Sequence, residues 1–384
     1  VYSTQSMHLL PLLFLLTSQI QIDGSFQDWP DGVTHQEDAQ FVYKRIVLED
    51  AACLQQLPEQ KIIQLGQYTI IFSPKDKGYG VACKLGDKSI SPYEAGVIFA
   101  PSTASTSFEI RANKPNISLP TKTFPLVATG DFRVVSWNVQ LGNVLDDRDR
   151  SARILNALKP NVILFQELDG DDTPEELSDF LTTSIGGLWL TSMSAVHGTA
   201  RHHKLRSAIS TKFNVSKEVD YGKLKAVLNT IEISKQPIQF LSLHLRCCGG
   251  PKSEAEMQRQ EEANVIRASI EQQQAPSWII AGDWNLVGTN IPLQIVKADT
   301  LSIVDAFQPD GLVAATWSDA DSSFTPGRLD WMLYSPKTLS LTNSFVFDTF
   351  DLDEQSLLKH NLSSDDTAQL SDHLPLVADF KVRK

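Results

Sequence analysis

The stretch Trp278–Asn285, which reads WIIAGDWN, decides the fold of residues 131–384. Its first four residues form an apolar run typical of a buried strand. Gly282 lets the chain turn sharply or lets a ligand approach closely. Asp283 and Asn285 lie two positions apart and can face the same way if the backbone stays extended. The carboxylate can then align or deprotonate a water, and the amide can donate to a phosphoryl oxygen. The alternative is an Asx-type turn.

Five further polar motifs have a similar setting, because nearly all of them adjoin an apolar, strand-like run. They are Trp137-Asn138, Gln166-Glu167, His244, Arg328-Leu329-Asp330 and Ser371-Asp372-His373. Side chains at strand ends can converge on one pocket. Carboxylates, amides and two histidines without clustered thiols suit a hard divalent cation and phosphate-ester chemistry.

Strands and helices alternate from Phe132 onwards, which predicts an α/β domain. Arg148–Leu158 has helical spacing, and Ser253–Ile270 is expected to be a long polar helix in which Ser253 and Glu256 have the spacing of a capping box. The expected strands are Phe132–Trp137, Val162–Phe165, Ile238–Leu245, Trp278–Ala281, Leu329–Tyr334 and Leu374–Phe380.

The N-terminal third has a different texture. Short β-like runs separated by Gly, Pro, Asp and Ser predict a small antiparallel sandwich over residues 21–112. These runs are Phe41–Leu48, Tyr68–Phe72, Gly80–Leu85, Gly96–Ala100 and Ser107–Arg111. Residues 113–130, with three prolines, are expected to be a linker. The opening Ile22–Trp29 resembles that of secreted modules related to family-nine carbohydrate-binding modules, which implies a weak carbohydrate contact; the alternative, which we favour, is that Trp29 packs the core.

The composition and the first residues indicate a soluble, exported protein. The formal net charge is −12, and such a surface repels nucleic acid and anionic membranes at long range, although a local basic groove or a metal can offset it. The run Leu9–Leu16 is too short to span a bilayer, which needs about 20 apolar residues. It predicts a signal peptide over residues 1–20 and a secreted or periplasmic monomer; the alternative is a buried N-terminal segment.

Four cysteines are present. A disulfide between Cys53 and Cys83 would fit an exported protein. The adjacent Cys247 and Cys248 can form a strained vicinal disulfide or remain two buried thiols. Because the chain has no CxxC pair, no structural zinc site is predicted.

Each polar candidate also has a structural interpretation. Glu167 is either a metal ligand or an ordinary loop acid, and His244 is either catalytic or a satisfied core group. An Asp330–His373 hydrogen bond would fix the imidazole tautomer, whether or not the pair is catalytic. Arg246 projects to the same face as His244 and can bind phosphate. The basic run from Arg201 to Arg206 is either a phosphate-gripping rim or a solvated loop.

Taken together, the motifs WN, QE, HL, GDWN, RLDW and SDH resemble the endonuclease/exonuclease/phosphatase superfamily over residues 131–384. That superfamily includes deoxyribonuclease I, exonuclease III, neutral sphingomyelinases and inositol-polyphosphate 5-phosphatases. The resemblance implies an α/β (α+β) four-layer sandwich with two mixed β-sheets, here preceded by the small all-β sandwich. It also implies Mg²⁺, or Mn²⁺ or Ca²⁺ as in some members, as the cofactor.

The same resemblance implies a role for each candidate residue. Glu167 would bind the metal with help from Asn138 and Asp372. Asp283 and Asn285 would position water and phosphate, and His244 would assist the leaving oxygen. His373, oriented by Asp330, would act on the attacking water or stabilise the phosphorane, with the general base assigned to the Asp283/His373 pair. Arg246 and Arg206 remain candidates for phosphate binding.

Departures from the family pattern separate the possible substrates. The tryptophan-cysteine-aspartate-arginine signature of the 5-phosphatases is absent, and Ile185–Leu190 is the nearest approach to the apolar hairpin of secreted sphingomyelinases. The CCGG sequence after His244 is more like that of exported bacterial members. The leading hypothesis is an exported metal-dependent nuclease acting on DNA or RNA. The alternatives are a phospholipid or small-molecule phosphoesterase, and a non-catalytic carbohydrate-binding or adhesion protein.

Overall fold

The computed structural model describes residues 20, 22, 26, 28–48, 57–74, 79–90, 95–101, 107–114, 126–198, 204–222, 224–250, 252–273, 275–308, 314–319 and 327–383. Three features singled out in the sequence lie outside these residues: the apolar run Leu9–Leu16, Cys53, and the first half, residues 201–203, of the basic run that ends at Arg206. Cys83 is a buried free thiol.

The N-terminal part is all β. One antiparallel sheet has the order β1-β2-β8-β7 and a second has the order β3-β4-β5-β6. Apolar side chains of the two sheets share one core, in which Phe72 contacts Phe99 and Phe108 edge to face. The predicted all-β fold is confirmed, whereas the domain boundaries stay a prediction. The strands are β1 (His35–Glu37), β2 (Phe41–Val47), β3 (Lys61–Leu65), β4 (Tyr68–Pro74), β5 (Tyr79–Leu85), β6 (Lys88–Ile90), β7 (Ile98–Pro101) and β8 (Ser107–Asn113).

Two six-stranded mixed sheets follow. The first has the order β11-β12-β10-β9-β20-β19, in which only β9 and β10 are parallel neighbours. It contains β9 (Phe132–Asn138), β10 (Val162–Asp169), β11 (Leu190–Met193), β12 (Leu205–Thr211), β19 (Leu339–Val346) and β20 (Leu376–Val382). The second has the order β13-β14-β15-β16-β18-β17, with β15 and β16 parallel. It contains β13 (Val215–Asp220), β14 (Lys225–Ile233), β15 (Gln236–His244), β16 (Trp278–Asp283), β17 (Ser302–Ile303) and β18 (Asp330–Tyr334).

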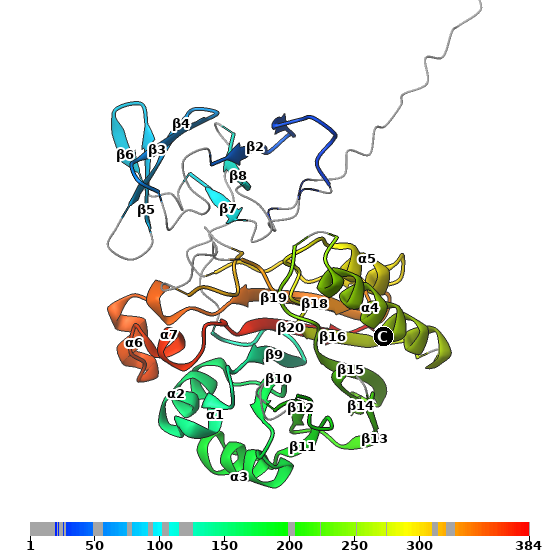
Figure 1. Ribbon diagram of the computed structural model, residues 1–384. Coiled ribbons are helices and arrows are strands. Elements are labelled where there is room, and N and C mark those ends of the chain that lie inside the picture. Colours follow the sequence, from blue (N-terminus) through cyan, green and yellow to red (C-terminus); the bar gives the residue numbers. More distant parts are fainter. Residues whose placement is uncertain are drawn as a thin grey trace, which may run out of the picture.

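Helices cover the outer faces of both sheets, so the predicted four-layer α/β sandwich is confirmed (Figure 1). The sheets share an apolar core that contains Phe132, Phe240 and Met332. The first sheet is covered by α1 (Asn143–Asp146), α2 (Arg148–Leu158), α3 (Pro174–Ile185), η2 (Thr349–Asp351), α6 (Glu354–His360) and α7 (Asp366–Leu370). The second is covered by α4 (Glu254–Gln273) and α5 (Ile291–Lys297). Among the described residues, no helix has the length and apolarity needed to cross a bilayer.

The start of α4 differs in one detail from the expected capping box. Ser253 does cap the helix, since its Oγ accepts from the Glu256 amide at 3.1 Å. The Glu256 carboxylate, however, turns into the protein and accepts from Arg259 at 2.8 Å. The side chains of Glu256 and Arg259 are buried, and Arg259 also donates to the backbone oxygens of Arg246 and Cys248. A buried cation therefore competes successfully for the carboxylate that would otherwise bond the helix N-terminus.

The N-terminal β-sandwich contacts the part of the chain that forms the two six-stranded sheets through a small apolar cluster. It joins Trp29, Phe41 and Tyr43 to Phe307 and Ala314. Trp29 is only 5% exposed and its Nε1 donates to Glu109 at 2.8 Å. This burial agrees with the packing interpretation of Trp29 and leaves little of its ring for a sugar.

Gly282, the glycine of GDWN, is expected to tolerate no side chain. Its φ is +153°, and a Cβ there would lie 1.8 Å from the Leu243 carbonyl oxygen of the neighbouring strand β15. Gly282→Ala should therefore lower the free energy of unfolding by about 3 kcal/mol or more, because the two parallel strands would have to separate. Urea unfolding measures this, with Gly250→Ala as control, since a Cβ at Gly250 meets nothing within 4 Å. Equal stability of the two variants would contradict the prediction.

Candidate active site

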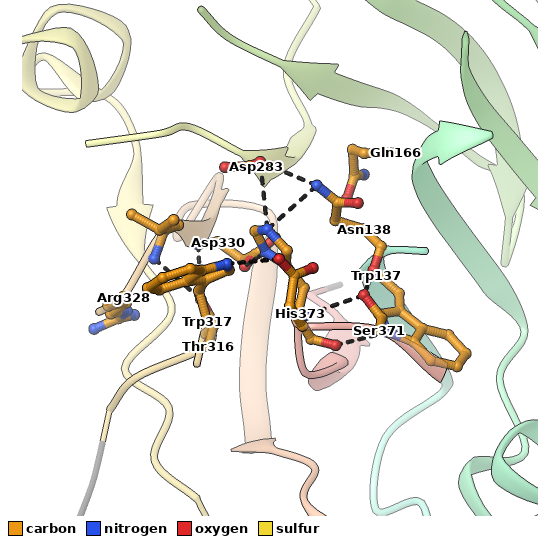
Figure 2. Close-up of polar contacts among 12 residues, drawn as sticks. Trp137, Asn138, Gln166, Asp283, Thr316, Trp317, Arg328, Asp330, Ser371 and His373 are labelled. Atoms are coloured by element: carbon orange, nitrogen blue, oxygen red, sulfur yellow. Dashed lines mark hydrogen bonds and ion pairs between the residues drawn. The ribbon is translucent and has the colours of Figure 1, made fainter. Parts of the chain in front are cut away.

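Topology brings all six polar motifs to one edge of the two sheets. The strands β9, β10, β15 and β16 carry Asn138, Glu167, His244 and Asp283 at or near their carboxyl ends. The strand β18 is antiparallel to β16 and begins with Asp330, which pairs with Asp283. The motif Ser371-Asp372-His373 precedes β20, which is antiparallel to β9. Ends of opposite polarity therefore meet at the same edge, where Asn138, Asp283 and His373 point toward one another (Figure 2).

The Asp283 carboxylate is the hub of the site. Its Oδ1 accepts from the Asn285 amide at 2.9 Å, and its Oδ2 accepts from Asn285 Nδ2 at 3.0 Å and from Asn138 Nδ2 at 3.1 Å. The Nε2 atoms of His244 and His373 lie 3.6 and 3.8 Å from the same Oδ2. Asp283 therefore forms the Asx turn that was the alternative interpretation of this motif. The turn orients the carboxylate toward both imidazoles.

His373 is held by a carboxylate on its other nitrogen. Its Nδ1 lies 2.7 Å from Asp330 Oδ2, which is the hydrogen bond expected from the sequence. Burial by itself lowers the pKa of His373, but the charges of Asp330 and Asp283 outweigh it and raise this pKa to about 10. The imidazole is therefore a cation at neutral pH, with its Nε2 on the side of Asp283.

The pKa values of Asp283 and His244 are shifted in the direction that favours the uncharged form of each side chain. Burial raises the pKa of Asp283 to about 7, and His373 opposes this rise. Burial, together with the positive charges of Lys225 and His373, lowers the pKa of His244 well below its usual value. A carboxyl group with a pKa near 7, beside one charged and one neutral imidazole, is suited to proton transfer.

Glu167 reaches the site through a local distortion of β10. The pairing of β10 with β12 shifts register between Phe165 and Leu168, and Glu167 has a φ of +57°. Such a bulge re-aims a side chain at some conformational cost. It places Glu167 Oε1 3.6 Å from His244 Nε2. Gln166, by contrast, is buried and donates to Ser242 Oγ at 3.0 Å, so it ties the two sheets together.

The donor set fits a divalent cation. Glu167, His244 and Asp283 each offer a ligand atom within 4.8 Å of the others, and Asp283, Asp330 and His373 form a second such group. Burial raises the pKa of Asp283, and within the described part of the chain Asp330 Oδ1 is buried without a hydrogen-bond partner. Oxygen-rich ligands of this kind bind Mg²⁺, Mn²⁺ or Ca²⁺, and a cation would offset the buried charge.

Asp372 lies next to these groups in sequence but has a different partner. Its Oδ2 accepts from Trp317 Nε1 at 2.9 Å, and it belongs to neither group of candidate ligands among the described residues. Its assignment to the metal therefore stays a prediction. Thr316 and Trp317, which we did not single out in the sequence, support the site, because Thr316 Oγ1 accepts from the Asp330 amide at 2.9 Å. Both lie in a loop without strand periodicity, so nothing in the sequence indicated them.

The structure separates the remaining candidates. Arg246 is exposed and lies two residues beyond His244 in the chain. Arg206 is instead tied to backbone oxygens, donating to Ser194 and Asp172 at 2.9 Å each, so the structure does not bring its guanidinium to the cluster. Cys247 and Cys248 have free thiols whose sulfur atoms are 2.8 Å apart. Cys248 is exposed and Cys247 half-buried, so they are not two buried thiols.

The metal-free protein is expected to lose stability as the pH rises from about 7 to about 10. In this window folded His373 keeps its proton, because its pKa is raised from 6.5 to about 10, whereas the unfolded chain has released it. The folded state then binds more protons, so the free energy of unfolding falls with pH. Urea unfolding in EDTA across this range, on the parent and on His373→Gln, measures the effect. An identical slope in both proteins would show that another group is responsible.

Comparison with known proteins identifies the family to which this fold and site belong. Residues 135–373 match the model of the Endonuclease/Exonuclease/phosphatase family. The chain belongs to this family, and it is a phosphoric ester hydrolase, as the motifs predicted. No curated protein matches the sequence.

Several solved structures are similar. A humanised TDP2 from D. rerio is 16% identical, with a TM-score of 0.47 over 65% of this chain and 98% of that one. An endonuclease/exonuclease/phosphatase family protein from Leptotrichia buccalis is 17% identical, with a TM-score of 0.47 over 65% and 99% of the two chains. The human Nocturnin catalytic domain is 17% identical, with a TM-score of 0.45 over 67% and 97%.

Proposed function

We propose that the protein is an exported phosphodiesterase that hydrolyses DNA or RNA with the help of Mg²⁺. The observation that carries the proposal is the position of the buried Asp283 carboxylate between His244 and His373, with Asp330 bonded to His373 and Glu167 beside His244. In-line attack on a phosphodiester needs a positioned water, charge neutralisation on the phosphoryl oxygens and help for the leaving oxygen. This cluster contains groups for each of the three.

The proposed roles follow from the contacts. Asp283, whose pKa is about 7, accepts the proton of the attacking water. His373 keeps its charge through Asp330 and stabilises the negative oxygens that develop on phosphorus. Asn138 and Asn285 hold the Asp283 carboxylate in place, and neutral His244 faces the leaving oxygen. A divalent cation bound by Glu167 and its neighbours would supply Lewis-acid charge at the phosphate.

The choice of nucleic acid rests on narrower grounds. The sequence lacks the tryptophan-cysteine-aspartate-arginine signature of the 5-phosphatases. Arg246 is exposed and follows His244 by two residues, and we infer that it contacts a phosphate of a longer substrate. Because the chain carries a net charge of −12, we expect binding to depend on the cation and on such local contacts rather than on a broad basic surface.

A substrate screen tests the proposal. Supercoiled plasmid, single-stranded RNA and sphingomyelin vesicles are incubated with the full chain and Mg²⁺, with EDTA and Asp283→Asn as the two negative controls. We expect cleavage of nucleic acid that both controls abolish. Release of the lipid head group without cleavage of DNA or RNA would replace the nuclease by a phospholipid phosphoesterase. Activity that survives both controls would assign the chemistry to another site.

Export and domain organisation are part of the same proposal. They rest on the run Leu9–Leu16 and on the division into residues 21–112, a linker at 113–130 and residues 131–384. Expression of the full chain in a bacterial host should yield protein outside the cytoplasm that lacks about the first 20 residues. Mass spectrometry of an unprocessed cytoplasmic product would contradict export without affecting the assignment of the active site.

A further inference from the structure

Lys225 is a partly buried cation at the proposed active site that no role above uses. It is the first residue of β14 and pairs with His244, the last residue of β15. Its Nζ lies 3.1 Å from His244 Nδ1 and 3.3 Å from His244 Nε2. Burial lowers the pKa of Lys225, and the nearby charges of Glu167 and Asp283 oppose this change. Because His244 is one of the candidate cation ligands, the ammonium lies beside that site.

The hydrogen-bonding capacity of this ammonium exceeds what His244 can satisfy. An ammonium has three donors, and an imidazole offers at most one acceptor nitrogen. Among the described residues, the recorded hydrogen-bond partners of Lys225 Nζ are the two ring nitrogens of His244. At least two N–H groups therefore remain for acceptors in the site, and a phosphate supplies such acceptors in its oxygens.

Two cations offset the negative charge of the site. Glu167, Asp283 and Asp330 would repel a phosphate ester that approaches the cluster. His373 offsets this repulsion from the side of Asp330 and Asn138. Lys225 is placed to do so from the side of His244 and Glu167. A phosphate between the two cations would be neutralised from both ends.

We propose that Lys225 is a phosphate-binding residue, whose ammonium donates to an oxygen of the substrate phosphate on the His244 side of Asp283. This inference rests on the proposed function, because it names a ligand of the same phosphate ester. A purely structural role is the competing explanation: Lys225 would then only balance the charge of Glu167 and Asp283.

Binding of inorganic phosphate separates the two explanations without any catalytic assay. Calorimetry is performed at saturating Mg²⁺ on the parent, Lys225→Met, Lys225→Arg and the control Lys217→Met, which alters an exposed lysine of the adjacent strand β13. Loss of a charge-assisted hydrogen bond should weaken phosphate binding of Lys225→Met by about 10- to 100-fold. Lys225→Arg should remain within a few-fold of the parent, and Lys217→Met should be unchanged. Unchanged phosphate affinity in Lys225→Met, with tighter Mg²⁺ binding, would overturn the proposal in favour of charge balance.

A second measurement uses the parent protein and does not depend on the folding of any variant. Lysines are acetylated with limiting acetic anhydride at saturating Mg²⁺, with and without inorganic phosphate, and the modified positions are quantified by mass spectrometry. Phosphate should protect Lys225 and leave Lys217 unaffected. Equal modification of Lys225 in both samples would overturn the proposal. Because neither readout requires hydrolysis, a failure of the substrate screen and a failure of this inference remain distinguishable.

Discussion

The His373→Ala variant is expected to hydrolyse its phosphodiester substrate about 10²- to 10⁴-fold more slowly than the parent. The parent keeps a charged imidazole against Asp283, since Asp330 Oδ2 lies 2.7 Å from His373 Nδ1 and the pKa is raised to about 10. Alanine removes the charge that stabilises the developing oxyanion and leaves the buried Asp330 carboxylate without its imidazole partner. The turnover number at saturating substrate and Mg²⁺ is the quantity to measure.

Two further variants make this result interpretable. His360→Ala, on the surface helix α6, is the matched control and should retain the parent turnover. Asp330→Asn keeps the shape of the side chain but removes its charge, so the pKa of His373 should fall and the upper limit of the pH–rate profile should move to lower pH. Turnover of His373→Ala close to that of the parent, with the protein folded by circular dichroism, would remove this histidine from the mechanism.

The Glu167→Gln variant is expected to need at least about 10-fold more Mg²⁺ for half-maximal activity. In the structure, Glu167, His244 and Asp283 offer ligand atoms within 4.8 Å of one another, and Glu167 supplies one of the two carboxylates in this group. An amide keeps the shape of the side chain, so folding should change far less than cation affinity. Calorimetric titration of the EDTA-treated protein with Mg²⁺ measures the affinity directly.

The neighbouring loop offers a control for the Glu167 result. Asp171 is an exposed acid just after β10, four residues beyond Glu167, and Asp171→Asn removes the same amount of charge. Its Mg²⁺ affinity should match that of the parent. If Glu167→Gln binds Mg²⁺ as tightly as the parent, Glu167 is not a ligand and the cation is held by other groups.

Much of the fold could be read from local patterns. The helix expected at Arg148–Leu158 has those bounds in the structure, because Asp147 caps its start and Lys159 ends it in the left-handed conformation ahead of Pro160. A local pattern also predicted the strands that carry Asn138, Glu167, His244 and Asp283 at or near their ends. A strand buried on both faces is a continuous apolar run, and its end is marked by the first polar residues.

The site was predictable to the extent that strand ends determine it. Asp330 and His373 lie 43 residues apart in the chain but hydrogen-bond as expected, since β18 and β20 both begin at the edge where β9 and β16 end. The bulge at Glu167 was not predictable, because the apolar run of β10 gives no sign of a register shift. Lys225 was missed for another reason: a lysine at the start of a strand is normally solvated, and only its pairing with His244 takes it into the site.

The amino-acid sequence by itself determined the family, the two-sheet sandwich and the polar residues at the strand ends, because burial periodicity and motif order are local properties of the chain. The tertiary structure decided which of those residues meet and in what charge state. Charge interactions depend on separation and burial, and neither is encoded locally. Asp283 has a pKa of about 7 only because it is buried and faces other charged groups that distant strands bring to it.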